Sequence, residues 1–270
     1  MQAVAIAQHE VLKLFGTRRG WVSIAAFVLV WGVILGLIIE PATRFLSNEE
    51  TGGIIGTIFG DRAERLTNNW ATLEVSLYWM VALYVLPVFA VLITADQMAS
   101  DRTRGTLRYL LLRCGRFTLF FSRFVGQLFI MALLVGITFL ASVALTALHS
   151  TDHAVQMLGD VLPVTLNLWL VLMPYVAMMS LLSVLARSSR QAIIFSIIGW
   201  IVVWILIRVV QNKFGGASWV GILDWVMPGA QIQGLLRLSD WNTLQLAPIP
   251  IAHTVVLLML GAFFMWRRDL

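Results

Sequence analysis

The chain has 270 residues, of which 59% are hydrophobic and 12% are charged, with a formal net charge of +5. Soluble globular domains carry about 25% charged residues, so an ordinary soluble domain is excluded, and the long continuous apolar runs exclude the alternating strands of a membrane barrel. A membrane-embedded backbone must satisfy its own polar groups, so the sequence predicts an all-α integral membrane protein with a single transmembrane domain over residues 1–270.

The N-terminal segment, residues 1–18, has the pattern of an amphipathic helix. Val4, Ala7, Val11 and Leu14 recur at helical spacing on one face, and Gln8, Glu10 and Lys13 lie elsewhere. A helix of this kind lies in the membrane interface instead of crossing the bilayer. The alternative is an ordinary lead-in to the first span.

Six apolar runs follow, each close to the roughly 20 residues that a helix needs to cross a bilayer. They are residues 21–39, 77–95, 124–148, 161–186, 192–210 and 249–266. We therefore expect six transmembrane helices, with a kink in the fourth, which contains Pro163 and Pro174.

The basic residues are distributed unevenly between the two sides of these runs. One side comprises both tails and residues 96–123 and 187–191; it holds 13 of the 19 basic residues, whereas the other side holds ten of the 14 acidic residues. Because lysine and arginine accumulate in cytoplasmic loops, we expect both termini in the cytoplasm and a multi-pass protein of a bacterial-type cytoplasmic (inner) membrane. Charge placed in this way gives no reason to expect a nucleic-acid partner.

Glycines recur every four residues in two places. Gly32 and Gly36 lie in the first run, and Gly52, Gly56 and Gly60 lie beyond it. Small-residue stripes permit close helix approach. The approach is either between helices of one chain or between two copies.

The loop between the second and third runs is the longest on the basic side, and residues 99–113 predict a short amphipathic helix. Leu107 and Leu111 share one face, and Arg104 and Arg108 share another. The guanidinium groups could pair with carboxylates of a partner, or they could serve only as the positive-inside signal.

This loop resembles the signature of a known family. The run Asp101-Arg102-x-x-Gly105-Thr106-Leu107, followed by Leu110-Leu111 and Arg116, is similar to the E-R-x-x-G-T-L…L-L…P-x-x-R signature of type-two ABC exporter permeases. An aspartate stands where glutamate is usual, and the proline is missing.

In the resembled family this segment is the coupling helix, which docks on a separate ATP-hydrolysing subunit. The resemblance implies an ATPase contact for Asp101, Arg102, Arg104, Gly105, Thr106, Leu107, Arg108 and Arg116. It also implies two ATPase copies that bind ATP-Mg, and a second permease copy as in a homodimer. The chain contains no G-x-x-x-x-G-K-[ST] phosphate loop, so we expect no catalytic residues and no cofactor bound by this chain.

His149, Asp152 and His153 form a polar cluster on the opposite side of the membrane. The two imidazoles would lie one turn apart if this segment is helical, and histidine is a common metal ligand. Two histidines and one carboxylate make a small set, however. We predict solvent-exposed loop residues and no metal site.

The span interiors carry no charged side chain or histidine near their middle, although ion-coupled carriers retain such groups as relays. The few polar groups include Asn167, Tyr175 and Ser180 in the fourth span, which are the candidates for lining a translocation path. A largely apolar path favours a hydrophobic or amphipathic cargo, with membrane lipid as a partner.

Residues 211–248, before the last span, are too hydrophobic for a free loop. We expect two short apolar helices around Pro228 and Gly229. They either dip into the membrane as a re-entrant hairpin or rest at its surface with tryptophans at the interface. The resembled family has a re-entrant hairpin here that caps the translocation path.

Together these patterns favour the transmembrane permease subunit of an ATP-driven transporter, acting as an exporter. The alternatives are a non-transporting membrane scaffold or assembly factor, and a secondary carrier. The missing intramembrane charges disfavour the carrier.

Overall fold

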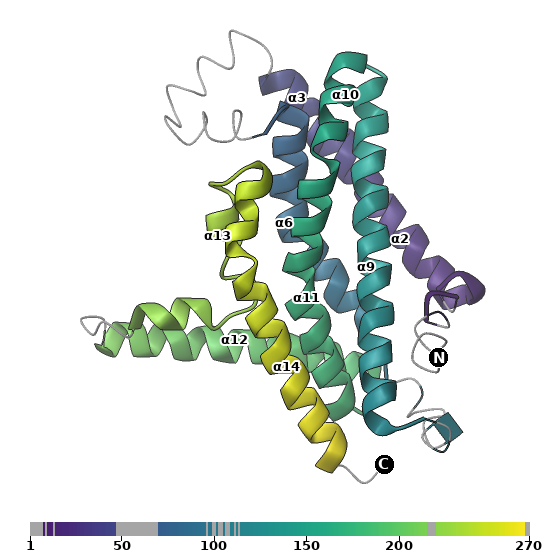
Figure 1. Ribbon diagram of the computed structural model, residues 1–270, viewed down its shortest axis with the longest axis vertical. Coiled ribbons are helices and arrows are strands. Elements are labelled where there is room, and N and C mark those ends of the chain that lie inside the picture. Colours follow the sequence, from purple (N-terminus) through teal and green to yellow (C-terminus); the bar gives the residue numbers. More distant parts are fainter. Residues whose placement is uncertain are drawn as a thin grey trace.

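The structure is a computed structural model, in which residues 8, 10–12, 14–46, 70–95, 97–98, 101, 105, 109–110, 112, 114–214 and 220–267 are described. In chain order the helices are α2 (Arg18–Ile34), the π-helix η1 (Leu35–Ile39), α3 (Glu40–Leu46), α6 (Leu73–Thr94), α9 (Arg116–Ala147), α10 (Thr151–Gly159), α11 (Val161–Leu185), α12 (Ser189–Phe214), the 3-10 helix η2 (Val220–Trp225), α13 (Ile232–Leu235), the 3-10 helix η3 (Asp240–Leu246) and α14 (Pro248–Arg267). Figure 1 shows the long helices α6, α9 and α11 side by side, with α2 crossing them obliquely.

Six helices in the described part of the chain are long and apolar enough to cross a membrane. They are Gly20–Phe45, Leu73–Thr94, Arg116–Ala147, Val161–Leu185, Ser189–Phe214 and Pro248–Arg267. The all-helical class is therefore confirmed for the described residues, and the number of candidate spans equals the number that the sequence predicts. The first candidate span is one continuous helix, which runs from α2 through η1 into α3.

Polar side chains cap three of the helices at their N-termini. The Thr17 hydroxyl accepts from the backbone N–H of Gly20 at 3.1 Å at the start of α2, and Thr72 and Ser150 cap α6 and α10 in the same way. Each cap satisfies a backbone donor that the helix leaves open. The caps fix where these helices begin.

The third span begins earlier than the sequence predicts. Gly115 has an extended backbone, and α9 starts directly after it at Arg116, whereas the apolar run starts at Phe124. The first two turns of α9 are therefore helical, although the sequence predicts a loop there. The charge of Arg123 is accommodated there because two carboxylates face it.

The helix α11 occupies the centre of the bundle, in contact with α6, α9, α12 and α14. In its most apolar window 67% of the residues are buried, against 11% for α12. Its two prolines lie within the continuous helix Val161–Leu185. The helix α2 lies on the side of the bundle opposite α14 (Figure 1).

Aromatic rings join α2, α6 and α9. Tyr78 of α6 stands edge-on to Trp31 and to Phe139, with ring centroids 5.7 and 5.2 Å apart. The Tyr78 hydroxyl lies 2.8 Å from the Thr138 hydroxyl. Edge-to-face pairs favour one relative placement of the helices, so this cluster fixes the first three spans against one another.

Figure 1 shows α12 leaving the bundle at a steep angle to α11. Its first half packs on the bundle through Ala192 and Ser196, whereas its second half packs on η2, with Ile207 buried. Apolar side chains further along, such as Ile201 and Leu206, are exposed.

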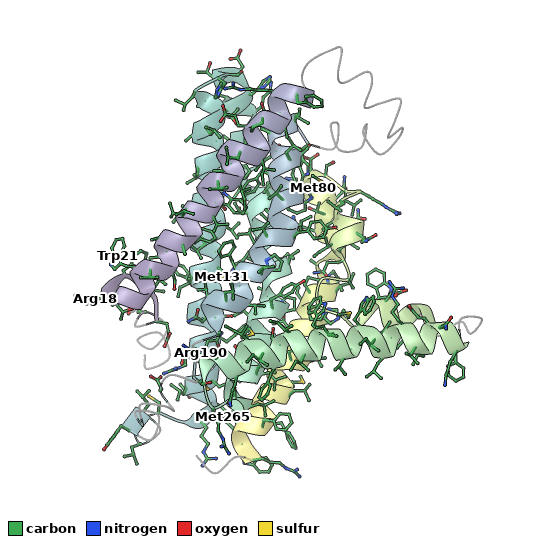
Figure 2. All side chains as sticks on the ribbon, turned by 180° about the vertical axis from the view of Figure 1, so that it is seen from behind. Arg18, Trp21, Met80, Met131, Arg190 and Met265 are labelled. Carbon is green, nitrogen blue, oxygen red and sulfur yellow. The ribbon has the colours of Figure 1, made fainter. Side chains whose placement is uncertain are left out.

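Both ends of the described chain lie toward the same end of the bundle. Figure 2 shows Arg18 and Trp21 at the outer start of α2, Arg190 at the start of α12 and Met265 near the end of α14. We call this region the basic end and define it by Arg116, Arg190 and Arg267.

Candidate functional site

Only part of the predicted coupling segment falls within the described residues. Asp101, Gly105 and Arg116 are described, whereas five predicted contacts lie outside: Arg102, Arg104, Thr106, Leu107 and Arg108. Gly105 has φ +70°, the left-handed region that glycine enters without strain. The glycine of the signature therefore matches a backbone that needs it.

The described ends of this segment contact the spans. The carboxylate of Asp101 pairs with the guanidinium of Arg123 on α9. Arg116 Nη1 donates to the carbonyl of Trp266 at 3.3 Å, which ties the start of α9 to the end of α14. Leu110 packs against a small cluster of buried apolar side chains at the basic end, formed by Met98, Leu119, Phe120, Val184 and Met265.

Two apolar side chains of the same segment point away from the protein. Tyr109 is 73% exposed and Leu112 is 84% exposed. Leu110 is half-buried, whereas Tyr109 and Leu112 on either side of it are exposed, so these two apolar side chains are available to a partner.

An apolar cavity of about 550 Å³ lies between α6, α11, α12 and the turn that precedes α13. It is lined by Leu83, Tyr84, Pro87, Val88, Val91, Leu92, Tyr175, Met178, Ile193, Ser196, Ile197, Trp200, Ile201, Pro228, Gly229, Ile232 and Gln233. Tyr84, Val88 and Ile197 are at least half exposed, so the cavity opens on the lateral surface of the spans. Cavities of this size and polarity hold drug-sized apolar ligands.

Tyr175 connects this cavity to the external segment. Its ring stacks on Trp200 of α12, with centroids 5.9 Å apart, and its hydroxyl donates to the carbonyl of Pro228 at 3.2 Å. Gly229 has φ +90°, and a Cβ there would overlap the Tyr175 hydroxyl. The turn therefore sits directly over the tyrosine.

The other two pathway candidates are occupied by bonds inside the bundle. Asn167 Nδ2 donates to the carbonyl of Pro163 at 2.7 Å. The Ser180 hydroxyl donates to Gln97 Oε1 at 2.7 Å, and both residues are buried. Only Tyr175 of the three lines the apolar cavity.

The external segment contains the two short helices expected around Pro228 and Gly229, namely η2 and α13. A third short helix, η3, follows them and leads into α14. His253 of α14 lies 2.6 Å from the carbonyl of Trp225, which holds η2 against the last span.

The histidines of the opposite end lie on two sides of a helix boundary. Because α9 ends at Ala147 and α10 begins at Thr151, His149 and His153 do not share one helix. Asp152 is exposed in the first turn of α10.

Each histidine faces a glutamate of another helix instead of facing the other histidine. His149 Nε2 lies 3.3 Å from Glu40 Oε1, and His153 Nδ1 lies 3.3 Å from Glu74 Oε1. They line a cavity of about 440 Å³. Within the described residues, no three histidine, cysteine or carboxylate side chains gather as a metal ion would require.

Sequence reasoning missed the pairing of Arg123 with Asp101 and with Glu10. A signal was present, since only four of the 14 acidic residues lie on the basic side of the chain, and these two are among them. A few acidic residues in a region rich in arginine are candidates for specific ion pairs with those arginines.

Residues 4–270 match the family model described as an ABC-2 family transporter protein. No curated protein matches the chain significantly.

Proposed function

Because the chain belongs to the ABC-2 transporter family and is a membrane-spanning permease subunit that works with an ABC ATPase subunit, we propose that it exports a hydrophobic or amphipathic cargo. The proposed cargo is a membrane lipid. The ATP and Mg²⁺ are bound by the partner, which supplies the chemical energy.

The proposed cargo is inferred from the apolar cavity that opens on the lateral surface of the spans. Its opening lies among exposed apolar side chains such as Tyr84 and Val88, which in a membrane face lipid tails. An apolar molecule can enter from the bilayer without crossing water. The turn at Gly229 above Tyr175 supports a re-entrant hairpin that closes the path on the outer side.

The exposed face of Tyr109 and Leu112 supports ATPase docking on residues 99–113. In this arrangement the basic end faces the cytoplasm, the first 18 residues lie in the interface, and both termini are cytoplasmic in an inner membrane. The arginines of the segment meet carboxylates of the ATPase.

A second copy of the permease covers the surfaces that one chain leaves open. A Cβ at Gly32 or Gly36 would meet no described atom within 4 Å, so packing against the described residues does not explain the glycine stripe of the first span. The exposed apolar length of α12 offers a further surface. The proposed assembly is a homodimer with two ATPase subunits.

Two neighbouring isoleucines of α12 give a matched test of the cavity. Ile197 lines it and Ile198 does not, and each is 53% exposed. In vesicles containing the complex, Ile197→Trp should reduce ATP-driven movement of a fluorescent phospholipid analogue at least about fivefold, because the indole fills the space. Ile198→Trp should leave it within about twofold. Equal losses would contradict the cavity as the cargo site.

Docking is tested by replacing Arg102 and Leu107 together with alanine. The double variant should insert normally but lose co-purification with its phosphate-loop ATPase, or lose transport while hydrolysis continues. Normal binding and transport by the variant would show that this segment is not the coupling helix.

A further inference from the structure

Three separate parts of the chain meet at one buried guanidinium near the basic end. Arg123 of α9 pairs with Asp101 of the 99–113 segment, and its Nε lies 3.8 Å from Glu10 Oε1 of the N-terminal segment. Gln127, one turn further along α9, donates from Nε2 to Glu10 Oε2 at 3.3 Å. The exposed fraction is 4% for both Arg123 and Glu10 and 15% for Asp101.

This burial separates Arg123 from the other basic residues of the same end. Four other arginines of this end are exposed, namely Arg18, Arg187, Arg190 and Arg267. The positive-inside rule alone accounts for their presence. Among the arginines whose side chains the structure describes, only Arg123 is buried. A guanidinium removed from water must keep a carboxylate, because the loss of its partner leaves an uncompensated charge in a poorly solvated place.

The arrangement holds one cation between two carboxylates. Asp101 belongs to the segment proposed to receive the push of the ATPase, whereas Glu10 belongs to the N-terminal segment that contacts the bundle core through its neighbour Val11. Nε and Nη1 of Arg123 make no hydrogen bond among the described residues, so the guanidinium has donors left for either carboxylate.

We propose that Arg123 is a positioning residue that transmits displacement of the 99–113 segment to α9 and to the N-terminal segment. This inference rests on the proposed function. If the segment moves, Asp101 moves with it; the buried guanidinium must then follow Asp101 or transfer to Glu10. In both cases a local displacement moves the third span, because Arg123 lies within the rigid helix α9.

The test follows motion at the far end of α9 in the complex with its ATPase, reconstituted in lipid vesicles. The parent protein carries Cys114→Ala and Ser142→Cys, which places a single thiol at a residue of α9 that is 2% exposed and borders the 440 Å³ cavity. The measurement is the rate of labelling by a membrane-impermeant maleimide, with and without ATP and vanadate. ATP hydrolysis is measured on the same vesicles.

In the parent protein, ATP and vanadate should raise the labelling rate at least about tenfold. Asp101→Asn and Arg123→Gln should each reduce this ATP-dependent increase in labelling to less than about twofold. The rate of ATP hydrolysis should stay within about twofold of the parent's. The increase is lost because removing one member of a buried ion pair changes the interaction energy by more than the amount to which a tenfold factor in rate corresponds. Arg190→Gln, which removes an exposed arginine of the same end (Figure 2), should leave it unchanged.

The outcomes separate the two proposals. A parent protein that shows no nucleotide-dependent response contradicts the proposed function itself. A parent that responds, with Asp101→Asn and Arg123→Gln responding equally, overturns the role of Arg123 alone. If Arg123→Gln does not insert into the membrane, the labelling response of Asp101→Asn decides the question, because that variant keeps the Arg123 guanidinium paired with Glu10. If neither variant inserts, or the response falls only in proportion to hydrolysis, the cluster is purely structural and the inference fails.

Discussion

Replacing Gly229 with alanine should destabilise the external segment through two separable effects. The first is backbone strain, since φ at this position is +90°, a region that costs a residue with a Cβ about 1–3 kcal/mol. The second is overlap of the new Cβ with the Tyr175 hydroxyl, for which overpacking typically costs about 1–3 kcal/mol. Their sum is about 2–6 kcal/mol.

The overlap can be removed without touching the backbone. Tyr175→Phe deletes the hydroxyl and its bond to the Pro228 carbonyl, at a cost of about 0.5–1.5 kcal/mol. In that background Gly229→Ala should cost little more than the strain, because the remaining close contact, 3.2 Å to Ile232 Cδ1, is with the end of a flexible side chain. The two substitutions should therefore show a favourable coupling of about 1–3 kcal/mol.

The assay is unfolding of the purified protein in mixed micelles titrated with SDS, followed for the two single variants and the double variant. Gly221→Ala is the control, because a Cβ there meets nothing within 4 Å in the same external segment, and it should change the free energy of unfolding by less than about 1 kcal/mol. If the effects of Gly229→Ala and Tyr175→Phe add within about 0.5 kcal/mol, the turn does not rest on the tyrosine.

Gly261→Val should cost about 1–3 kcal/mol in the same unfolding assay, because a Cβ there would lie 2.5 Å from Phe120 Cζ, where α14 packs on α9 and α11. Ser180→Ala should cost about 1–3 kcal/mol, since it deprives the buried Gln97 of its partner at 2.7 Å; transport per folded molecule should be unchanged. Burial raises the pKa of Asp160, and the negative charge of a nearby aspartate raises it further. The folded state therefore favours the protonated carboxyl, and its stabilisation is present at low pH and lost as the pH rises through the raised pKa. Asp160→Asn should accordingly raise the midpoint of thermal unfolding at pH 7, with a gain that shrinks toward pH 4.

Each of these three has an outcome that would contradict it. Gly199→Val, at a helical glycine with nothing within 4 Å, should be near neutral, and an equal loss there would show that crowding is not the cause. A Ser180→Ala variant that keeps its stability but loses transport would place this hydroxyl in the path. Asp152→Asn removes an exposed carboxylate, and an equal gain from it would refute the burial argument.

The sequence by itself determined the class of the protein, the number of candidate spans and their approximate bounds. These properties depend on sums over about 20 consecutive residues, because a helix in lipid satisfies its own backbone and needs only a continuous apolar exterior. The family signature was visible for the same reason: Gly105 and its neighbours are close in the chain.

Tertiary structure alone decided which residues meet. Asp101 and Arg123 are 22 residues apart, Tyr175 and Pro228 are 53 apart, and Glu10 and Gln127 are 117 apart. Hydropathy and helical periodicity carry no information over such separations, because the contacts depend on which helices pack together and on the side chains that a neighbouring helix presents. The same limit explains why three similar polar candidates of the fourth span differ, with one lining a cavity and two held by bonds within the bundle.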